Sequence, residues 1–173
     1  MVLVYHGTSV RQGIKIAMTG AILSPLEMRI RLFRQANPER LASAFPGKTL
    51  EEAAIESISF AYGEHEIDHR VKSVSVVNEI EHAVHYAMMY EIRLKDFEKK
   101  DVSGGLILAV DIDSTCFDRL VVPTAKYIRY IPDRLSIDSL KEIHLSPMAR
   151  RNSETTLREA FSKCNPIYKY IEK

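Results

Sequence analysis

The chain has 173 residues, of which 46% are hydrophobic and 27% charged, and this composition is typical of one soluble globular domain with a buried core. Its formal net charge of +1 gives no overall attraction to nucleic acid or membrane, so electrostatic steering would come from local patches. No apolar run approaches the roughly 20 residues that cross a bilayer, and no signal-peptide pattern opens the chain, so we expect a cytoplasmic protein without a membrane partner.

Four segments predict the elements of the first third of the chain. Val2 to Tyr5 can form a strand that leads into His6-Gly7-Thr8, where a glycine would let the backbone approach a ligand closely. Ser24-Pro25-Leu26-Glu27 combines an N-cap serine, a proline at the first helical position and a reciprocal glutamate, which together predict the start of a helix. Thr49-Leu50-Glu51-Glu52 is a second capping box, and it predicts a helix that ends at Gly63. The chain after the first strand is therefore expected to be mostly helical.

The rest of the chain alternates strands and helices without a regular period. Ser73 to Val76 alternate serine and valine like a half-buried strand, which we expect to begin near Arg70, and Asn78-Glu79-Ile80-Glu81 caps a helix. Gly104-Gly105 precedes the apolar run Leu106 to Val110, a buried strand by length and content. This uneven spacing favours an α+β fold over a doubly wound sheet. The later elements are expected at Tyr127 to Ile131 (strand), Ser136 to Leu140 (short turn or helix), Ile143 to Leu145 (strand) and Ser153 to Ser162 (helix).

The His6-Gly7-Thr8 turn resembles the opening of ADP-ribosyltransferase-fold proteins, in which the first core strand ends in a His-Gly-Ser or His-Gly-Thr turn that holds NAD. The resemblance implies a split mixed β-sheet with helices between the first and second core strands. It implies a single domain over 1–173, with a C-terminal helical extension over 150–173. It also implies that the backbone of Gly7 and the side chains of His6 and Thr8 hold the ligand, with His6 orienting a ribose hydroxyl.

A second resemblance lies in the strand 74–78 and the helix that follows it. In poly-ADP-ribose-polymerase-like members, a strand tyrosine precedes a helix whose small residue binds the carboxamide and whose tyrosine stacks on nicotinamide. An ungapped alignment places Tyr86 at the stacking position, Ser75 at the strand tyrosine and Ala83 at the small residue. The Ser73-x-Ser75 pattern also resembles the serine-bearing strand of the bacterial toxin branch. We expect His6 and Tyr86 to line one cleft with room for a flat ring; the alternative is a Tyr86 that packs in the core.

The resemblance departs from the family at the catalytic acid. Members carry a glutamate on a late strand that is followed by a proline and a turn, and here its position falls near Ile128 or Arg129, where no acid stands. Three explanations remain open. Asp133 or Glu142 serves as the acid, or the domain binds NAD without transferring it, or Arg129 supports different chemistry, as arginines do in the RNA 2'-phosphotransferases that share the turn. The candidate catalytic residues are therefore His6, Arg129 and Asp133.

Arginines gather after the first glycines, at Arg29, Arg31, Arg34 and Arg40. They fit a solvated basic face of an amphipathic helix. Arginine also binds phosphate with two parallel hydrogen bonds, and family members contact the dinucleotide with an arginine near this point. Arg29 and Arg31 are therefore candidate ligands of the NAD pyrophosphate. A nucleic-acid groove is a weaker alternative, because aromatic residues are few here.

A rival motif is His65-Glu66-Ile67-Asp68-His69, which has the H-E-x-x-H spacing of a zinc hydrolase. The charge of Asp68 and the nearby Gly63 argue against a metal-binding helix, so we expect no metal and a solvated loop. Cys116 and Cys164 fit neither a Cys-x-x-Cys nor a metal-ligand pattern, and reduced thiols are expected.

The function that the sequence implies is an NAD-binding, ADP-ribosyltransferase-like protein that passes ADP-ribose to a protein, a nucleic acid or water. The alternatives are a non-catalytic NAD or ADP-ribose binding module, an enzyme like the RNA 2'-phosphotransferases without the usual glutamate, and a zinc hydrolase built on His65, Glu66 and His69.

Overall fold

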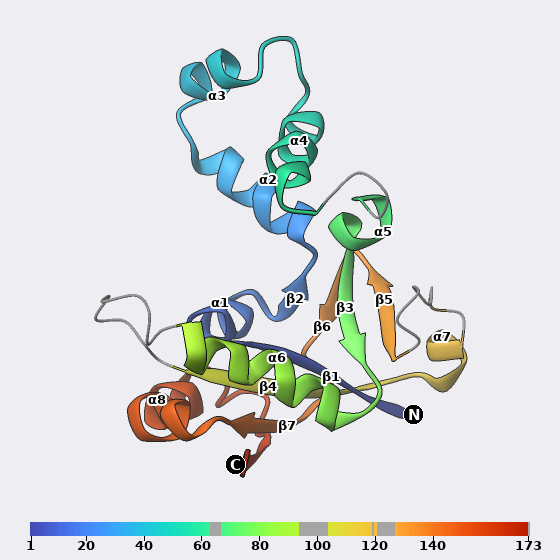
Figure 1. Cartoon of the computed structure of the whole chain (residues 1–173), viewed down its shortest axis with the longest axis vertical. Coiled ribbons are helices and arrows are strands. Elements are labelled where there is room, and N and C mark those ends of the chain that lie inside the picture. The colour runs from blue at the N-terminus through green and yellow to red at the C-terminus, as the bar shows by residue number, and fades with distance from the viewer. Residues whose placement is uncertain (63–66, 94–103, 119, 121–126, 173) are drawn as a thin grey trace. The chain divides into compact units, whose positions relative to one another are not determined.

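The computed structural model of the chain describes residues 1–62, 67–93, 104–118, 120 and 127–172 (Figure 1). These residues form two compact units, each described by itself below. The first consists of Met1–Ala21, Val76–Arg129 and Ser136–Lys173, and the second of Ile22–Ser75 and Tyr130–Leu135. Within the described ranges, no helix is long and apolar enough to cross a membrane.

A six-stranded mixed sheet has the strand order β5-β3-β1-β4-β7-β8. Strand β1 lies antiparallel to β4, β4 lies antiparallel to β7, and β7 and β8 are parallel. Among the described residues, five helices lie between β1 and β3. The predicted α+β class, with a mixed sheet and helices between its first two core strands, is confirmed. The strands are β1 (Val2–Ser9), β3 (Ser73–Val77), β4 (Gly105–Ile112), β5 (Ile128–Pro132), β7 (Leu140–Leu145) and β8 (Ile167–Tyr170).

Helices pack on both faces of the sheet in the first unit. On one face, α6 (Ile80–Arg93) buries Ala83 and Ala87 against a cluster that includes Ile107 of β4. On the other face lies α1 (Val10–Thr19), where the missing side chain of Gly13 leaves room for Leu106. Successive residues of a strand point to opposite faces, so Leu106 and Ile107 reach different helices. The short helix α7 (Ser114–Asp118) follows β4.

Helix α8 (Pro147–Ala160) begins six residues before the predicted start at Ser153. The buried hydroxyl of Ser146 accepts from Ala149 N at 3.3 Å, and a carboxylate oxygen of Glu91 accepts from Met148 N at 2.7 Å. Ser146-Pro147 is the same capping pattern that predicts the helix at Ser24. The segment expected to be a helical extension also contains a strand, β8, whose residues pair with β7.

The second unit is mainly helical, as predicted. Ser24 caps α2 (Pro25–Gln35) through a 3.2 Å bond from Glu27 N, and Thr49 exchanges bonds of 2.7 and 3.2 Å with Glu52 before α4 (Leu50–Tyr62). The strand expected to begin at Arg70 is preceded instead by the helix α5 (Ile67–Lys72), because Val71 packs on the apolar faces of α2 and α4. The remaining elements are α3 (Pro38–Ala44) and the two-stranded sheet of β2 (Ala21–Leu23) and β6 (Arg134–Ser136).

Candidate functional site

The His6-Gly7-Thr8 motif lies in the second half of β1. Its residues pair with Leu108, Ile107 and Leu106 of β4, in that order. Among the described residues, the register between β1 and β3 is Tyr5↔Val77, which precedes the motif. The motif thus begins just after the point at which β1 lies between two strands.

At Gly7, β1 and α6 approach each other closely. A Cβ on Gly7 would lie 2.6 Å from the carbonyl oxygen of Ala83, 2.9 Å from the Cβ of Tyr86 and 3.1 Å from the backbone nitrogen of Ala87. Two of these atoms belong to the helix backbone, which does not move aside as a flexible side chain would. The glycine that the sequence suggests for a close ligand contact is thus already required by the packing of a helix.

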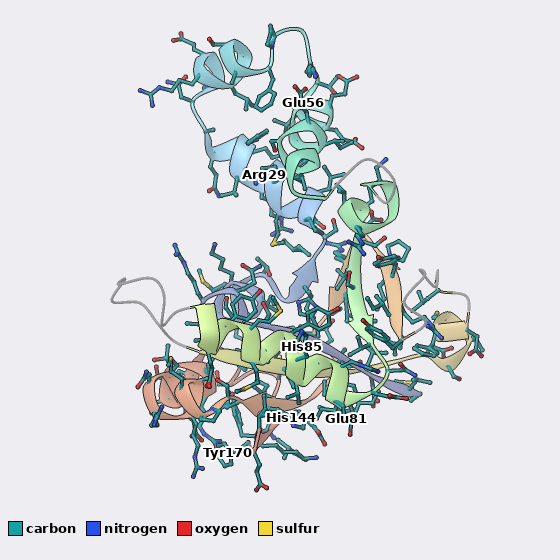
Figure 2. All side chains as sticks on the ribbon, in the orientation of Figure 1. Arg29, Glu56, Glu81, His85, His144 and Tyr170 are labelled. Carbon is teal, nitrogen blue, oxygen red and sulfur yellow. The ribbon has the colours of Figure 1, made fainter. Side chains whose placement is uncertain are left out.

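Tyr86 leaves α6 beside this contact, and its side chain is 37% exposed. Its ring meets the ring of His85 edge-on, with the centroids 5.9 Å apart; Figure 2 shows His85 on α6. Ala83 and Ala87, on the same helix, are fully buried. Tyr86 therefore does not pack in the core beside these two alanines, and the structure places the Cβ of this exposed tyrosine next to Gly7.

The side chain of His6 points away from α6. Tyr5 packs in the cluster beneath α6, and the missing Cβ of Gly7 also faces that helix. Because side chains alternate along a strand, His6 projects from the opposite face. The expectation that His6 and Tyr86 line one cleft side by side is wrong for this reason. Thr8 shares the face of His6 and is buried.

Arg129 stands in β5, where the resemblance predicts the family glutamate. Its Nη1 donates to the carbonyl oxygen of Ile128 at 3.0 Å, and its guanidinium lies 5.2 Å from the centroid of the Phe117 ring. The five residues of β5 are Ile, Arg, Tyr, Ile and Pro, so this strand offers no carboxylate. The structure thus places a cation on the strand where family members carry an anion.

Glu142, an alternative acid, is engaged in a partly buried polar cluster. Its two carboxylate oxygens meet Lys169 Nζ at 2.6 Å and His144 Nε2 at 2.8 Å. Burial opposes ionisation of Glu142, but these hydrogen bonds outweigh it and hold its pKa below the usual value. The bond from Lys169 to Glu142 therefore links β8 to β7. Burial, together with the nearby carboxylate of Glu142, also raises the pKa of Tyr5.

Asp133, the other alternative acid, lies in the second unit at the turn between β5 and β6. Its backbone is left-handed, with φ of 59°, and asparagine and aspartate tolerate this conformation better than most residues do. Its backbone nitrogen donates to Lys72 O at 2.8 Å, and its carbonyl oxygen accepts from Ser24 N at 2.8 Å. The backbone of Asp133 thus joins three segments of this unit.

The predicted phosphate ligands and the strand serine also belong to the second unit. Arg31 pairs with Glu27 at 2.9 Å, and the guanidinium of Arg29 lies 5.9 Å from the centroid of the Phe33 ring. Ser75 is an exposed residue of β3. Their binding roles remain predictions.

The H-E-x-x-H motif falls partly outside the described residues, which do not include His65 and Glu66. His69 belongs to α5. Among the described side chains, no group of three or more His, Cys, Asp or Glu could hold a metal ion.

Sequence reasoning missed one aromatic pair at the start of α6. The rings of His82 and Tyr127 are stacked, with centroids 4.1 Å apart and planes inclined by 18°. No spacing rule connects two residues so far apart in the chain, so only the fold could reveal the pair.

No family model and no curated protein matches this chain. Solved structures of the ADP-ribosyltransferases DarT and DarTG are similar to it. Thermus sp. 2.9 DarT in complex with ADP-ribosylated ssDNA is 11% identical with a TM-score of 0.50, and the match covers 98% of this chain and 94% of that one. Thermus sp. 2.9 DarT in complex with NAD+ is 10% identical with a TM-score of 0.48, covering 98% and 95%.

Thermosipho africanus DarTG in complex with ADP-ribose is also 10% identical with a TM-score of 0.48. The match covers 98% of this chain and 50% of that one, so this chain spans about half the length of DarTG. The match to Thermus sp. 2.9 DarT with a TM-score of 0.50 covers nearly all of both chains, so it concerns the whole fold of this chain. The chain therefore has the ADP-ribosyltransferase-like fold that its first strand predicts.

Proposed function

We propose that the protein binds NAD and transfers ADP-ribose from it to a macromolecular acceptor or to water. The observation that carries the proposal is the close approach of Gly7 to α6 at Tyr86, a residue that is 37% exposed. The backbone of a strand offers donors and acceptors for a carboxamide, and a tyrosine face suits a flat cationic ring. Structural neighbours bound to NAD+ and ADP-ribose support the same ligand.

His6 would act from the other face of β1. NAD is long enough to contact more than one residue of β1, because it contains two riboses and a pyrophosphate. The backbone of Gly7 would bind the nicotinamide end, and the side chain of His6 would orient a ribose hydroxyl. Thr8 would support His6 on that face. In the reaction, the bond between nicotinamide and its ribose breaks as the ribose carbon gains oxocarbenium character, and an acceptor oxygen or nitrogen then bonds to that carbon.

Arg29, Arg31 and Ser75 remain the proposed ligands for the rest of the dinucleotide. A guanidinium has five donors, so Arg31 keeps several available while Glu27 accepts one bond. Arg29 contacts the ring of Phe33 through its guanidinium, and this contact does not occupy the N–H donors of Arg29.

A second candidate function is binding of NAD or ADP-ribose without transfer. The observation that favours it is the composition of β5, which presents Arg129 and no carboxylate. A group that stabilises the transition state typically contributes a hundredfold or more to the rate. A ligand-binding module, or an enzyme that uses arginine as RNA 2'-phosphotransferases do, would need no acid there.

The acceptor that we favour is a nucleic acid. The support is a structural neighbour determined with ADP-ribosylated ssDNA.

Thermal unfolding with and without NAD tests the proposal. At a hundredfold excess over its dissociation constant, NAD should stabilise the fold by about 2.7 kcal/mol, which raises the melting temperature visibly. Tyr86→Ala should remove most of this rise, whereas Tyr86→Phe, which keeps the ring, should preserve it. His6→Ala should also reduce the rise while leaving the unliganded melting temperature nearly unchanged. The absence of any shift at millimolar NAD would overturn the proposal, and release of nicotinamide would separate an enzyme from a binding module.

A further inference from the structure

The stacked pair of His82 and Tyr127 is an exposed feature that NAD binding, as proposed above, does not use. Its rings are nearly parallel, with centroids 4.1 Å apart. Tyr127 is 38% exposed, and the side chain of His82 is also 38% exposed. The two rings are already stacked on each other, and an aromatic ring face that remains accessible can extend such a stack to another flat ring.

The pair lies within reach of the proposed nicotinamide site. His82 and Tyr86 are four residues apart on α6, and side chains at this spacing are neighbours on a helix surface, about 5–6 Å apart at their Cβ atoms. Tyr127 directly precedes β5, two residues before Arg129. One helical turn thus separates the ring beside Gly7 from the stacked pair, and all these residues belong to the first unit.

The charges around the pair favour a base over a phosphate. A carboxylate oxygen of Glu79 lies 3.4 Å from Nε2 of His82, and this anion would repel a phosphate placed directly on the pair. The cation of Arg129 lies on the neighbouring strand, over Phe117. A nucleotide whose base meets the rings and whose phosphate turns towards Arg129 keeps its negative charge away from Glu79 and near a cation. Every nucleobase has a flat π face, so such stacking needs no particular sequence.

We propose that His82 and Tyr127 form a stacking platform for one base of a single-stranded nucleic-acid acceptor, placed one helical turn from Tyr86. The proposal rests on the proposed function in one respect, since it identifies the acceptor of the same site. The platform would position the acceptor strand next to the ribose from which nicotinamide leaves.

Binding of a short fluorescent single-stranded DNA to the full chain, followed by anisotropy, tests the platform. Tyr127→Ala and His82→Ala should each weaken binding by about 5-fold to 100-fold, the range measured for the loss of one stacked base. Tyr127→Phe should bind like the wild type because it keeps the ring. Tyr170→Ala is the matched control: Tyr170 is 40% exposed and stacks with Arg150, but lies in β8. It should leave DNA affinity unchanged.

Three further measurements decide the interpretation. The NAD-dependent rise in melting temperature should be the same in Tyr127→Ala and in the wild type. If the wild type shows no such rise but Tyr127→Ala still weakens DNA binding, the platform is supported and the proposed NAD function is not. Equal DNA affinity in wild type and both alanine variants would overturn the platform. Equally tight binding of inorganic polyphosphate, or tighter binding of an aromatic peptide than of DNA, would also overturn it.

Discussion

Nε2 of His144 lies 2.8 Å from Oε2 of Glu142, two residues earlier on β7, and both side chains are largely buried. Burial lowers the pKa of His144, and the neighbouring carboxylate only partly opposes this effect. His144 is therefore neutral in the folded protein near pH 7 and donates its Nε2 proton to Glu142. Lys169, the register partner of His144 on β8, supplies the positive charge of the cluster.

Acid should destabilise the fold through this cluster, beginning below neutral pH. His144 has a folded pKa below its unfolded value of about 6.5, so the unfolded state binds the extra proton and the free energy of unfolding falls as pH decreases through that value. Glu142 has a lowered pKa, so its contribution persists above about pH 4.5 and disappears below. Urea unfolding at pH 8, 7, 6 and 5 measures this. His144→Gln should flatten the profile between pH 7 and 5, whereas exposed His85→Gln should not; identical profiles in both would contradict the assignment.

Gly7→Ala should destabilise the protein by about 1–3 kcal/mol, the usual cost of forcing a methyl group into a packed interior. The added Cβ would stand 2.6 Å from the Ala83 carbonyl oxygen, so α6 must shift. Urea denaturation measures the loss. We also expect Gly7→Ala to reduce NAD binding, because a displaced α6 carries Tyr86 away from β1.

Gly13→Ala is the matched control. Its Cβ would meet only the flexible end of the Leu106 side chain, and alanine gains up to about 1 kcal/mol over glycine within a helix. The stability of Gly13→Ala should therefore stay close to that of the wild type. Similar losses at both glycines would show that the approach of α6 is not the cause.

Arg129→Glu tests the missing acid. If the domain binds NAD without transfer, wild-type release of nicotinamide should be slow, and a carboxylate in β5 should raise it. Turnover of labelled NAD and its affinity are measured in parallel, because an Arg129 that grips phosphate would instead make the substitution weaken binding. If the wild type transfers ADP-ribose rapidly, and this activity is kept in Arg129→Ala but lost in Asp133→Asn, Asp133 is identified as the acid.

If His65 and His69 are solvated, as the sequence predicts, replacing both by alanine should change stability by no more than about 0.5 kcal/mol, the usual range for surface substitutions. Metal analysis of the purified wild type should find no stoichiometric zinc. Zinc that disappears together with activity in the double variant would favour the hydrolase alternative instead.

Local signals predict much of this fold. The caps at Ser24 and Thr49 are confirmed because N-terminal capping depends on neighbours within four residues, which the sequence displays directly. Ser146-Pro147 carries the same signal, yet the predicted helix starts too late. The helix around Arg70 could not be predicted, because a segment of only six residues becomes helical through the tertiary burial of Val71.

The candidate site is harder to predict than the fold. The sequence indicates the motif around Gly7 and the position of Tyr86, but the face from which His6 projects depends on the register of β1 and its packing on α6. The stack of His82 on Tyr127 is a contact between elements that only the completed fold brings together.

The residue that follows β8 helps to hold α6 in place. Ile171 follows β8, donates its backbone N–H to Leu145 O at 2.9 Å and packs in the same cluster as Ala83 and Ala87 of α6. That helix carries both Tyr86 and His82. A truncation before Ile171, or a bulky fusion attached next to it, would therefore remove or disturb an apolar contact that supports α6. Ligand binding would weaken although every proposed ligand-binding residue is unchanged.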